Sequence, residues 1–165
     1  MKKIILEKLH RITKNKKKLE KELNVKITNR GKEVFIDGEP EDEYYAEKVI
    51  DALNFGFPFE TALTIKKENL IFEILNIKDY TRRKDLERIK ARIIGKKGKT
   101  LSVLHGLTKC SFELKDNTVG IIGNPEYIKN AQEAVIAIIK GSKQSNVYNF
   151  LEKNQSGKVL DLGLK

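Results

Sequence analysis

The chain has few of the residues that mark several common protein classes. It contains one cysteine, two histidines and no tryptophan among 165 residues. The lone Cys110 excludes an internal disulfide and a cysteine-cluster zinc site. His10 and His105 have no acidic or nucleophilic partner evident in the sequence, so neither metal binding nor catalysis is expected. The chain is therefore predicted not to be an enzyme and to carry no cofactor.

Aromatic residues and long hydrophobic runs are also scarce. Aromatic side chains make up 7% of the chain, so stacking is not expected to dominate any contact with nucleic-acid bases. The longest apolar run, Ala134 to Ile139, is too short to cross a bilayer, and the apolar stretch after Lys3 stops at Glu7. We expect a cytoplasmic protein without membrane contact.

Acidic residues are outnumbered by basic ones. The chain has 33 Lys and Arg against 23 Asp and Glu, a formal net charge of +10. Between Arg82 and Lys99 there are nine basic and only two acidic residues, Asp85 and Glu87. This excess favours a polyanionic partner such as nucleic acid, although a solvated surface accounts equally well for part of it.

Within the basic segment lies a Gly-x-x-Gly loop, Gly95-Lys96-Lys97-Gly98. Glycines let a main chain approach a sugar-phosphate backbone closely, and lysines and the N–H groups of a following helix neutralise the phosphate charge. The predicted apolar groove beside it is walled by Ile94, Leu101 and the strand around Phe112. The candidate RNA-binding residues are Arg88, Arg92, Ile94, Gly95, Lys96, Lys97, Gly98, Lys99 and Thr100.

The same loop ends in Gly98-Lys99-Thr100, as a nucleotide-binding P-loop does. A P-loop needs four residues between its glycines, and the first glycine would then fall at Ile93. The segment before the loop also has the periodicity of a helix instead of a strand. Nucleotide hydrolysis is thus the weaker alternative, and magnesium-dependent nucleotide binding would distinguish the two.

The chain repeats itself with a shift of 85 positions and no gap. The shift superposes identical residues on Leu104, Val119, Ile121, Gly123, Pro125, Ala131 and Gly141. In the second copy we predict strands over 70–77, 109–115 and 118–122, and helices over 84–94 and 125–140, with another helix after the loop. In the first copy we predict strands over 24–29 and 33–37 and a helix over 41–54.

This order is that of the eukaryotic-type (type I) KH fold, an α+β architecture with helices on one face of an antiparallel three-stranded sheet. The predicted domains are 1–65, a degenerate KH domain with a linker, and 66–154, a KH domain with the GxxG loop and a C-terminal helix. Residues 155–165 are predicted to form a flexible tail, and the apolar linker after Gly56 predicts a rigid pair of domains.

The first copy lacks the glycine loop. The ungapped register places His10-Arg11-Ile12-Thr13 opposite the loop. We expect Lys2 to Leu6 to form an edge strand and the helix and loop after it to be missing. Its basic residues either contact phosphates without specificity or form a solvated helix face; they are Arg11, Lys14, Lys16, Lys17, Lys18, Lys21 and Lys26.

Several segments together resemble the archaeal KH-domain ribosome-assembly family, which is related to the eukaryotic factor called partner of Nob. They are Ile93–Thr100, Val119–Gly123, Ala131–Ala134, Gly141 with Val147–Glu152, Gly56–Leu63 and Asp79–Thr81. Two positions depart from the family pattern: Ala91 replaces a glycine, and the first copy has no GxxG.

The resemblance implies a non-enzymatic factor that binds single-stranded RNA at the 3′ end region of small-subunit ribosomal RNA. It also implies contact with the alpha subunit of initiation factor two and with the endonuclease that trims the precursor. The alternative is a KH-fold scaffold that mainly binds these protein partners, with little RNA contact. Composition and spacing by themselves support only single-stranded RNA binding.

Overall fold

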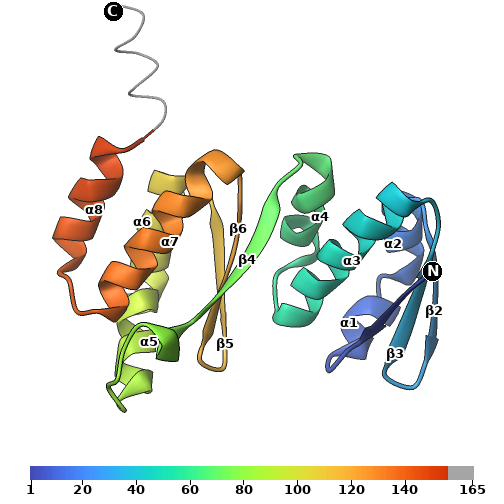
Figure 1. Ribbon diagram of the computed structural model, residues 1–165, viewed down its shortest axis with the longest axis horizontal. Helices are drawn as coiled ribbons and strands as arrows, with labels where there is room; N and C mark the ends of the chain where they lie inside the picture. Colours follow the sequence, from blue (N-terminus) through green and yellow to red (C-terminus); the bar gives the residue numbers. More distant parts are fainter. Residues whose placement is uncertain (156–165) are drawn as a thin grey trace, which may run out of the picture. The chain divides into compact units, whose positions relative to one another are not determined.

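The structure, a computed structural model, describes residues 1–155 and divides into two compact units. Unit 1 comprises Met1–Leu70, and unit 2 begins at Ile71. Each unit contains one antiparallel three-stranded sheet with its helices on one face (Figure 1). The predicted α+β class with two such sheets is confirmed. The predicted tail begins at the last described residue and otherwise lies outside the described residues.

Unit 2 follows the predicted order of elements. They are β4 (Ile71–Asn76), the 3-10 turn η1 (Ile77–Asp79), α5 (Leu86–Ile94), the 3-10 turn η2 (Lys96–Gly98), α6 (Lys99–Thr108), β5 (Ser111–Lys115), β6 (Thr118–Gly123), α7 (Pro125–Ile139) and α8 (Gln144–Lys153). The strand order is β4-β6-β5. Helix α7 begins with Asn124, whose side chain accepts the Glu126 N–H, and with Pro125 in its first turn.

The core of unit 2 lies between its sheet and its helices. Val119 on the central strand β6 pairs with Leu75 on β4 and Leu114 on β5. Val119 and Ile121, two positions apart on one face of the strand, are fully buried beneath the helices. Helix α8, which packs on α6 and α7, buries Val147 and Leu151.

Unit 1 contains the same order of strands and α-helices as unit 2, without the two 3-10 turns. The elements are β1 (Lys2–Ile5), α1 (Leu9–Thr13), α2 (Lys16–Leu23), β2 (Lys26–Arg30), β3 (Glu33–Asp37), α3 (Pro40–Phe55) and α4 (Phe59–Lys67). The strand order β1-β3-β2 matches that of unit 2. The predicted edge strand at the start of the chain is confirmed.

The prediction that unit 1 lacks the helix after this strand is wrong. The short helix α1 is present, and it contains the His10–Thr13 segment that the ungapped register placed at the loop. The connection between α1 and α2 is formed by Lys14 and Asn15. The edge strands explain the error: Ile4 and Leu75 occupy equivalent positions only 71 residues apart, whereas the rest of the repeat is offset by 85. Unit 1 has a shortened helix instead of a missing one.

The segment predicted as a linker forms helix α4 within unit 1. Ala62, Leu63 and Ile65 are buried, and the rings of Phe55 and Phe57 stack with centroids 5.8 Å apart. Burial of these side chains explains why the segment is more apolar than a flexible spacer. None of the helices within residues 1–155 is long and apolar enough to cross a membrane.

Candidate nucleic-acid interface

Helix α5 presents a charged face on a firmly anchored backbone. Ile89 and Ile93 are buried in the core of unit 2, and Leu86 packs against that core. The spacing of three and four residues places these side chains on one face of the helix. Arg88 and Glu87 are exposed on the other side. The apolar face therefore anchors the helix on the core of unit 2, and the loop follows directly after the last turn of the helix.

The loop itself is a tight turn built on left-handed backbone conformations. Gly95 has φ 79° and ψ 170°, Lys97 has φ 55° and ψ 30°, and Gly98 has φ 76° and ψ 13°. The Gly95 N–H donates to the Ala91 carbonyl at 2.8 Å, and the Gly98 N–H donates to the Gly95 carbonyl at 3.1 Å. These bonds end α5 and fix the path of the main chain into α6.

The two glycines are needed for different reasons. A Cβ atom on Gly95 would lie 2.1 Å from Thr100 Oγ1 and 2.5 Å from the Thr100 nitrogen, so this glycine permits close packing inside the protein. A Cβ atom on Gly98 would have no heavy atom within 4 Å. Thus only Gly98 leaves open space beside the main chain for a ligand to approach.

The lysines of the loop supply its exposed positive charge. Lys96, Lys97 and Lys99 are all exposed, whereas Thr100 is 5% exposed. The N–H of Lys99 donates to the Lys96 carbonyl. This N–H, one of those predicted to meet a phosphate, is therefore used within the loop, and the lysine ammonium groups are the flexible donors that face solvent.

A groove lies beside α5, between this helix and the β5–β6 turn. Its lining residues are Glu87, Lys90, Ala91, Ile94, Leu114 and Asp116. Ile94 is 38% exposed although it is a large apolar residue at the end of the helix. Together with Ala91 and Leu114 it gives the groove an apolar wall.

The sequence predicted that Ile94, Leu101 and the strand around Phe112 wall this groove. Ile94 and that strand, β5, line it, whereas Leu101 and the Phe112 side chain itself are not among the lining residues. The strand residue in the wall is Leu114. Because Phe112 and Leu114 alternate onto the same face of β5, periodicity alone does not distinguish them, and only the packing of α5 against the sheet selects Leu114.

Two cations near the groove make structural contacts. Lys90 donates to the Asp116 carbonyl at 3.0 Å and pairs with Glu87 at 2.9 Å, which links α5 to the β5–β6 turn. Arg92 donates to the Ile138 carbonyl at 2.8 Å and also to the Ser142 carbonyl, so its guanidinium joins the last turn of α5 to the end of α7. Sequence analysis gave Lys90 no role.

The surroundings of the loop do not fit a P-loop. A P-loop connects a strand to a helix, and here helix α5 precedes the loop. The buried Cys110 is equally unsuited to nucleophilic chemistry, because burial raises the pKa of its thiol to about 11.

The order of elements, the GxxG geometry and the adjacent groove are those of a KH domain. Residues 71–156 match the eukaryotic-type KH domain (KH-domain type I) in the form that stands second in PNO1 proteins. The chain belongs to the PNO1 family of KH-domain proteins. The family resemblance predicted from the sequence is confirmed.

Curated PNO1 relatives match over different parts of their length. The KH domain-containing protein MJ0443 of Methanocaldococcus jannaschii is 32% identical over 85% of this chain and 65% of its own length. The pre-rRNA-processing protein PNO1 of Eremothecium gossypii is 34% identical over 62% of this chain and 39% of its own. The chain therefore spans about two thirds or less of these proteins.

Solved KH structures extend the similarity to both units. Dim2p from Pyrococcus horikoshii is 30% identical, with a TM-score of 0.84 over 92% of this chain and 98% of that one. A second structure from the same organism, of an a/eIF2alpha–aDim2p–rRNA complex, matches at 30% identity and a TM-score of 0.83, over 94% of each chain. Both units of this chain are thus covered by the similarity to these structures.

Proposed function

We propose that the protein binds single-stranded RNA through the KH domain of unit 2 and acts in small-subunit ribosomal RNA maturation. The observation that carries this proposal is the open space beside Gly98, flanked by exposed Lys96, Lys97 and Lys99 and leading to an apolar groove. A glycine with open space beside it, basic side chains and an apolar groove are the parts a KH domain uses on single-stranded RNA.

The RNA backbone would pass over Gly98 and the bases would enter the groove. A phosphate beside Gly98 is within reach of the three flexible lysine side chains, which neutralise its charge. The next bases would pack on Ala91, Ile94 and Leu114. Exposed Arg88, one helical turn before Arg92, would contact a phosphate or a base edge from α5. Arg92 would act through the position of α5, because its guanidinium binds main-chain carbonyls.

The type of RNA is inferred from the relatives. PNO1 of E. gossypii is a pre-rRNA-processing protein, and aDim2p of P. horikoshii was crystallised with rRNA and a/eIF2alpha. We take the 3′ end region of small-subunit rRNA as the target of this chain. The protein would act as a non-enzymatic cytoplasmic factor and would work beside the endonuclease that trims the precursor.

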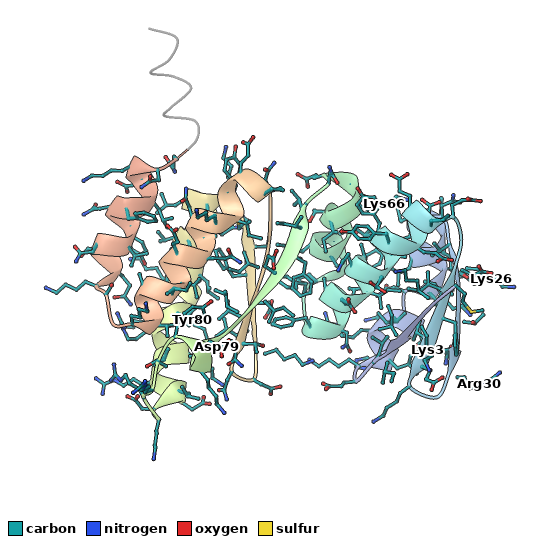
Figure 2. The ribbon with its side chains drawn as sticks, viewed as in Figure 1. Lys3, Lys26, Arg30, Lys66, Asp79 and Tyr80 are labelled. Carbon is teal, nitrogen blue, oxygen red and sulfur yellow. The ribbon has the colours of Figure 1, made fainter. Side chains whose placement is uncertain are left out.

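A protein partner is the second candidate function. The presence of a/eIF2alpha in the complex with aDim2p favours an equivalent contact for this chain. In unit 1, Arg11 is not available for RNA in this conformation, since its guanidinium donates to the Phe57 carbonyl at 2.8 Å. The open face of the unit 1 sheet carries Lys3, Lys26 and Arg30 (Figure 2). It also carries the 68% exposed Ile5, a mixed surface that suits a protein.

An NMR titration tests which unit meets RNA. Adding a short single-stranded RNA that matches the rRNA 3′ end to ¹⁵N-labelled full-length protein should shift the amide signals of residues 94–101 and 114–116. A scrambled RNA should shift the same signals at higher concentration. Shifts confined to unit 1, or none at all, would contradict the proposal and favour the protein-binding scaffold.

A further inference from the structure

A second basic depression lies on unit 2 outside the GxxG loop and its groove. It is lined by Lys78, Asp79, Tyr80, Thr81, Arg82 and Lys140, and we refer to it as the Lys78 pocket. Three different segments form it: η1, the stretch between η1 and α5, and the end of α7. Its three cations outnumber its single carboxylate.

These three cations make no polar side-chain contact with the described part of the chain. Lys78, Arg82 and Lys140 are exposed, and within residues 1–155 their side chains form no ion pair or hydrogen bond. Neighbouring cations differ: Arg83 pairs with Asp85 at 3.2 Å, and Lys90 pairs with Glu87. Three like charges around one depression repel one another, and a bound anion would relieve that repulsion.

The neutral groups of the pocket are held in place. The ring of Tyr80 packs against the core of unit 2. Thr81 Oγ1 accepts the Arg83 N–H at 3.2 Å, which leaves its hydroxyl hydrogen free to be donated. Fixed hydroxyl donors beside flexible cations suit a phosphate group, whose oxygens accept several hydrogen bonds.

Asp79 narrows the choice of ligand. A carboxylate among the cations disfavours a small, highly charged anion, but it accepts a hydrogen bond from a neutral hydroxyl group. A ribose supplies such a hydroxyl next to each phosphate, and the 2′-hydroxyl is the group by which a protein distinguishes RNA from DNA. One ribose-phosphate unit therefore satisfies both the cations and the carboxylate.

The pocket and the GxxG loop are connected by Arg92. Its guanidinium holds the Ile138 and Ser142 carbonyls, which flank Lys140, and it lies three residues before Gly95. Tyr80 packs against the same core that buries Ile89 and Ile93 of α5, the helix that leads into the loop. The end of α7 is thus tied to the helical turn that precedes the loop.

We propose that the Lys78 pocket binds a ribose-phosphate unit of the same RNA strand that the GxxG loop grips, with Lys78, Arg82 and Lys140 on the phosphate and Asp79 on the 2′-hydroxyl. The proposal rests on the proposed function, because it extends the path of that RNA. It gives a role to Lys78 and Arg82 before α5, which the loop and groove leave unused.

The first test compares RNAs of two lengths on full-length protein. The double variant Lys78→Gln plus Lys140→Gln should bind a four-nucleotide RNA as the wild type does. It should bind a twelve-nucleotide RNA roughly tenfold more weakly, with a salt slope shallower by about 0.7, the value for one lost phosphate contact. The control variant Lys129→Gln plus Lys153→Gln removes two other exposed lysines of unit 2 and should bind both RNAs normally.

The second test concerns the sugar. Asp79→Ala, which removes the acceptor, should reduce the preference of the protein for twelve-nucleotide RNA over DNA of the same sequence, and it should leave the four-nucleotide RNA unaffected. Unchanged affinity of the double variant for the long RNA would overturn the proposal while leaving the GxxG site intact. Loss of affinity for both lengths in the double variant would also overturn it, since the pocket would then not be a separate contact.

Discussion

At the scale of the residue, the loop depends on two glycines with different surroundings. Gly95 is packed against Thr100, whereas Gly98 faces open space with φ 76°. Gly95→Ala should lower the free energy of unfolding of the protein by about 2–4 kcal/mol, since it adds both overlap and backbone strain. Gly98→Ala should cost about 1–2 kcal/mol through strain alone.

Urea unfolding and RNA binding of these two variants check this difference. We expect Gly98→Ala to weaken RNA binding in a protein that remains folded at 25 °C, because its methyl group occupies the space a phosphate would use. Equal destabilisation by the two substitutions, or normal RNA affinity of a folded Gly98→Ala variant, would refute the separate roles.

Cys110 gives a prediction about pH. Burial raises the pKa of its thiol from 9.0 to about 11 in the folded protein, partly offset by hydrogen bonding with the Thr108 side chain. A raised pKa stabilises the folded state fully below pH 9, and this contribution is lost as pH rises from about 9 to about 11. The stability of the wild type relative to Cys110→Ala should therefore decline over that range in urea unfolding. A constant difference would show that the thiol is not desolvated.

At the scale of the element, two arginines of α5 are expected to have different roles: Arg92 stabilises the fold, and Arg88 contacts RNA. Arg92 joins α5 to the end of α7, so Arg92→Gln should lower the free energy of unfolding by roughly 1.5–3 kcal/mol. Arg88 is exposed, and Arg88→Gln should change stability by less than about 0.5 kcal/mol.

Thermal unfolding and RNA binding of the pair test this assignment. Arg88→Gln should bind RNA about fivefold more weakly at low salt, with an unchanged melting temperature. A drop in melting temperature for Arg88→Gln with none for Arg92→Gln would reverse the two roles.

The elements themselves differ in how well sequence predicted them. The β5–β6–α7 repeat was found because the period of its apolar residues and its turn residues, Asp116 and Asn117, agree with one another. Helix α1 was missed because it has only five residues, too few for an apolar period. Helix α4 was missed because its apolar residues were attributed to a linker between domains.

At the scale of the whole molecule, the sequence pointed to the GxxG loop more directly than to the groove or the Lys78 pocket. The loop is continuous in sequence, so its glycines and lysines were identified directly. The groove is lined by residues of α5 and by Leu114 and Asp116, which lie more than 19 residues further along the chain. The Lys78 pocket is lined by residues 78–82 and by Lys140 at the end of α7. Such contacts between distant segments depend on tertiary packing, which the periodicity of apolar residues does not specify.

The net charge of the molecule leads to a prediction about salt. If three to five phosphates are neutralised, the logarithm of RNA affinity should fall with the logarithm of salt concentration at a slope of roughly −2 to −4. Fluorescence anisotropy between 50 and 300 mM KCl would measure the slope. A slope near zero would indicate that the charge of +10 is not used on RNA.

The most direct test of the account is the affinity of the full-length protein for a single-stranded RNA matching the rRNA 3′ end, measured by fluorescence anisotropy. The wild type should prefer this RNA to a scrambled one. Lys96→Asp plus Lys97→Asp should abolish binding, while the matched reversal Lys129→Asp plus Lys153→Asp should retain most of it. Unchanged binding by a folded Lys96→Asp plus Lys97→Asp variant would contradict the claim that the GxxG loop of unit 2 grips RNA.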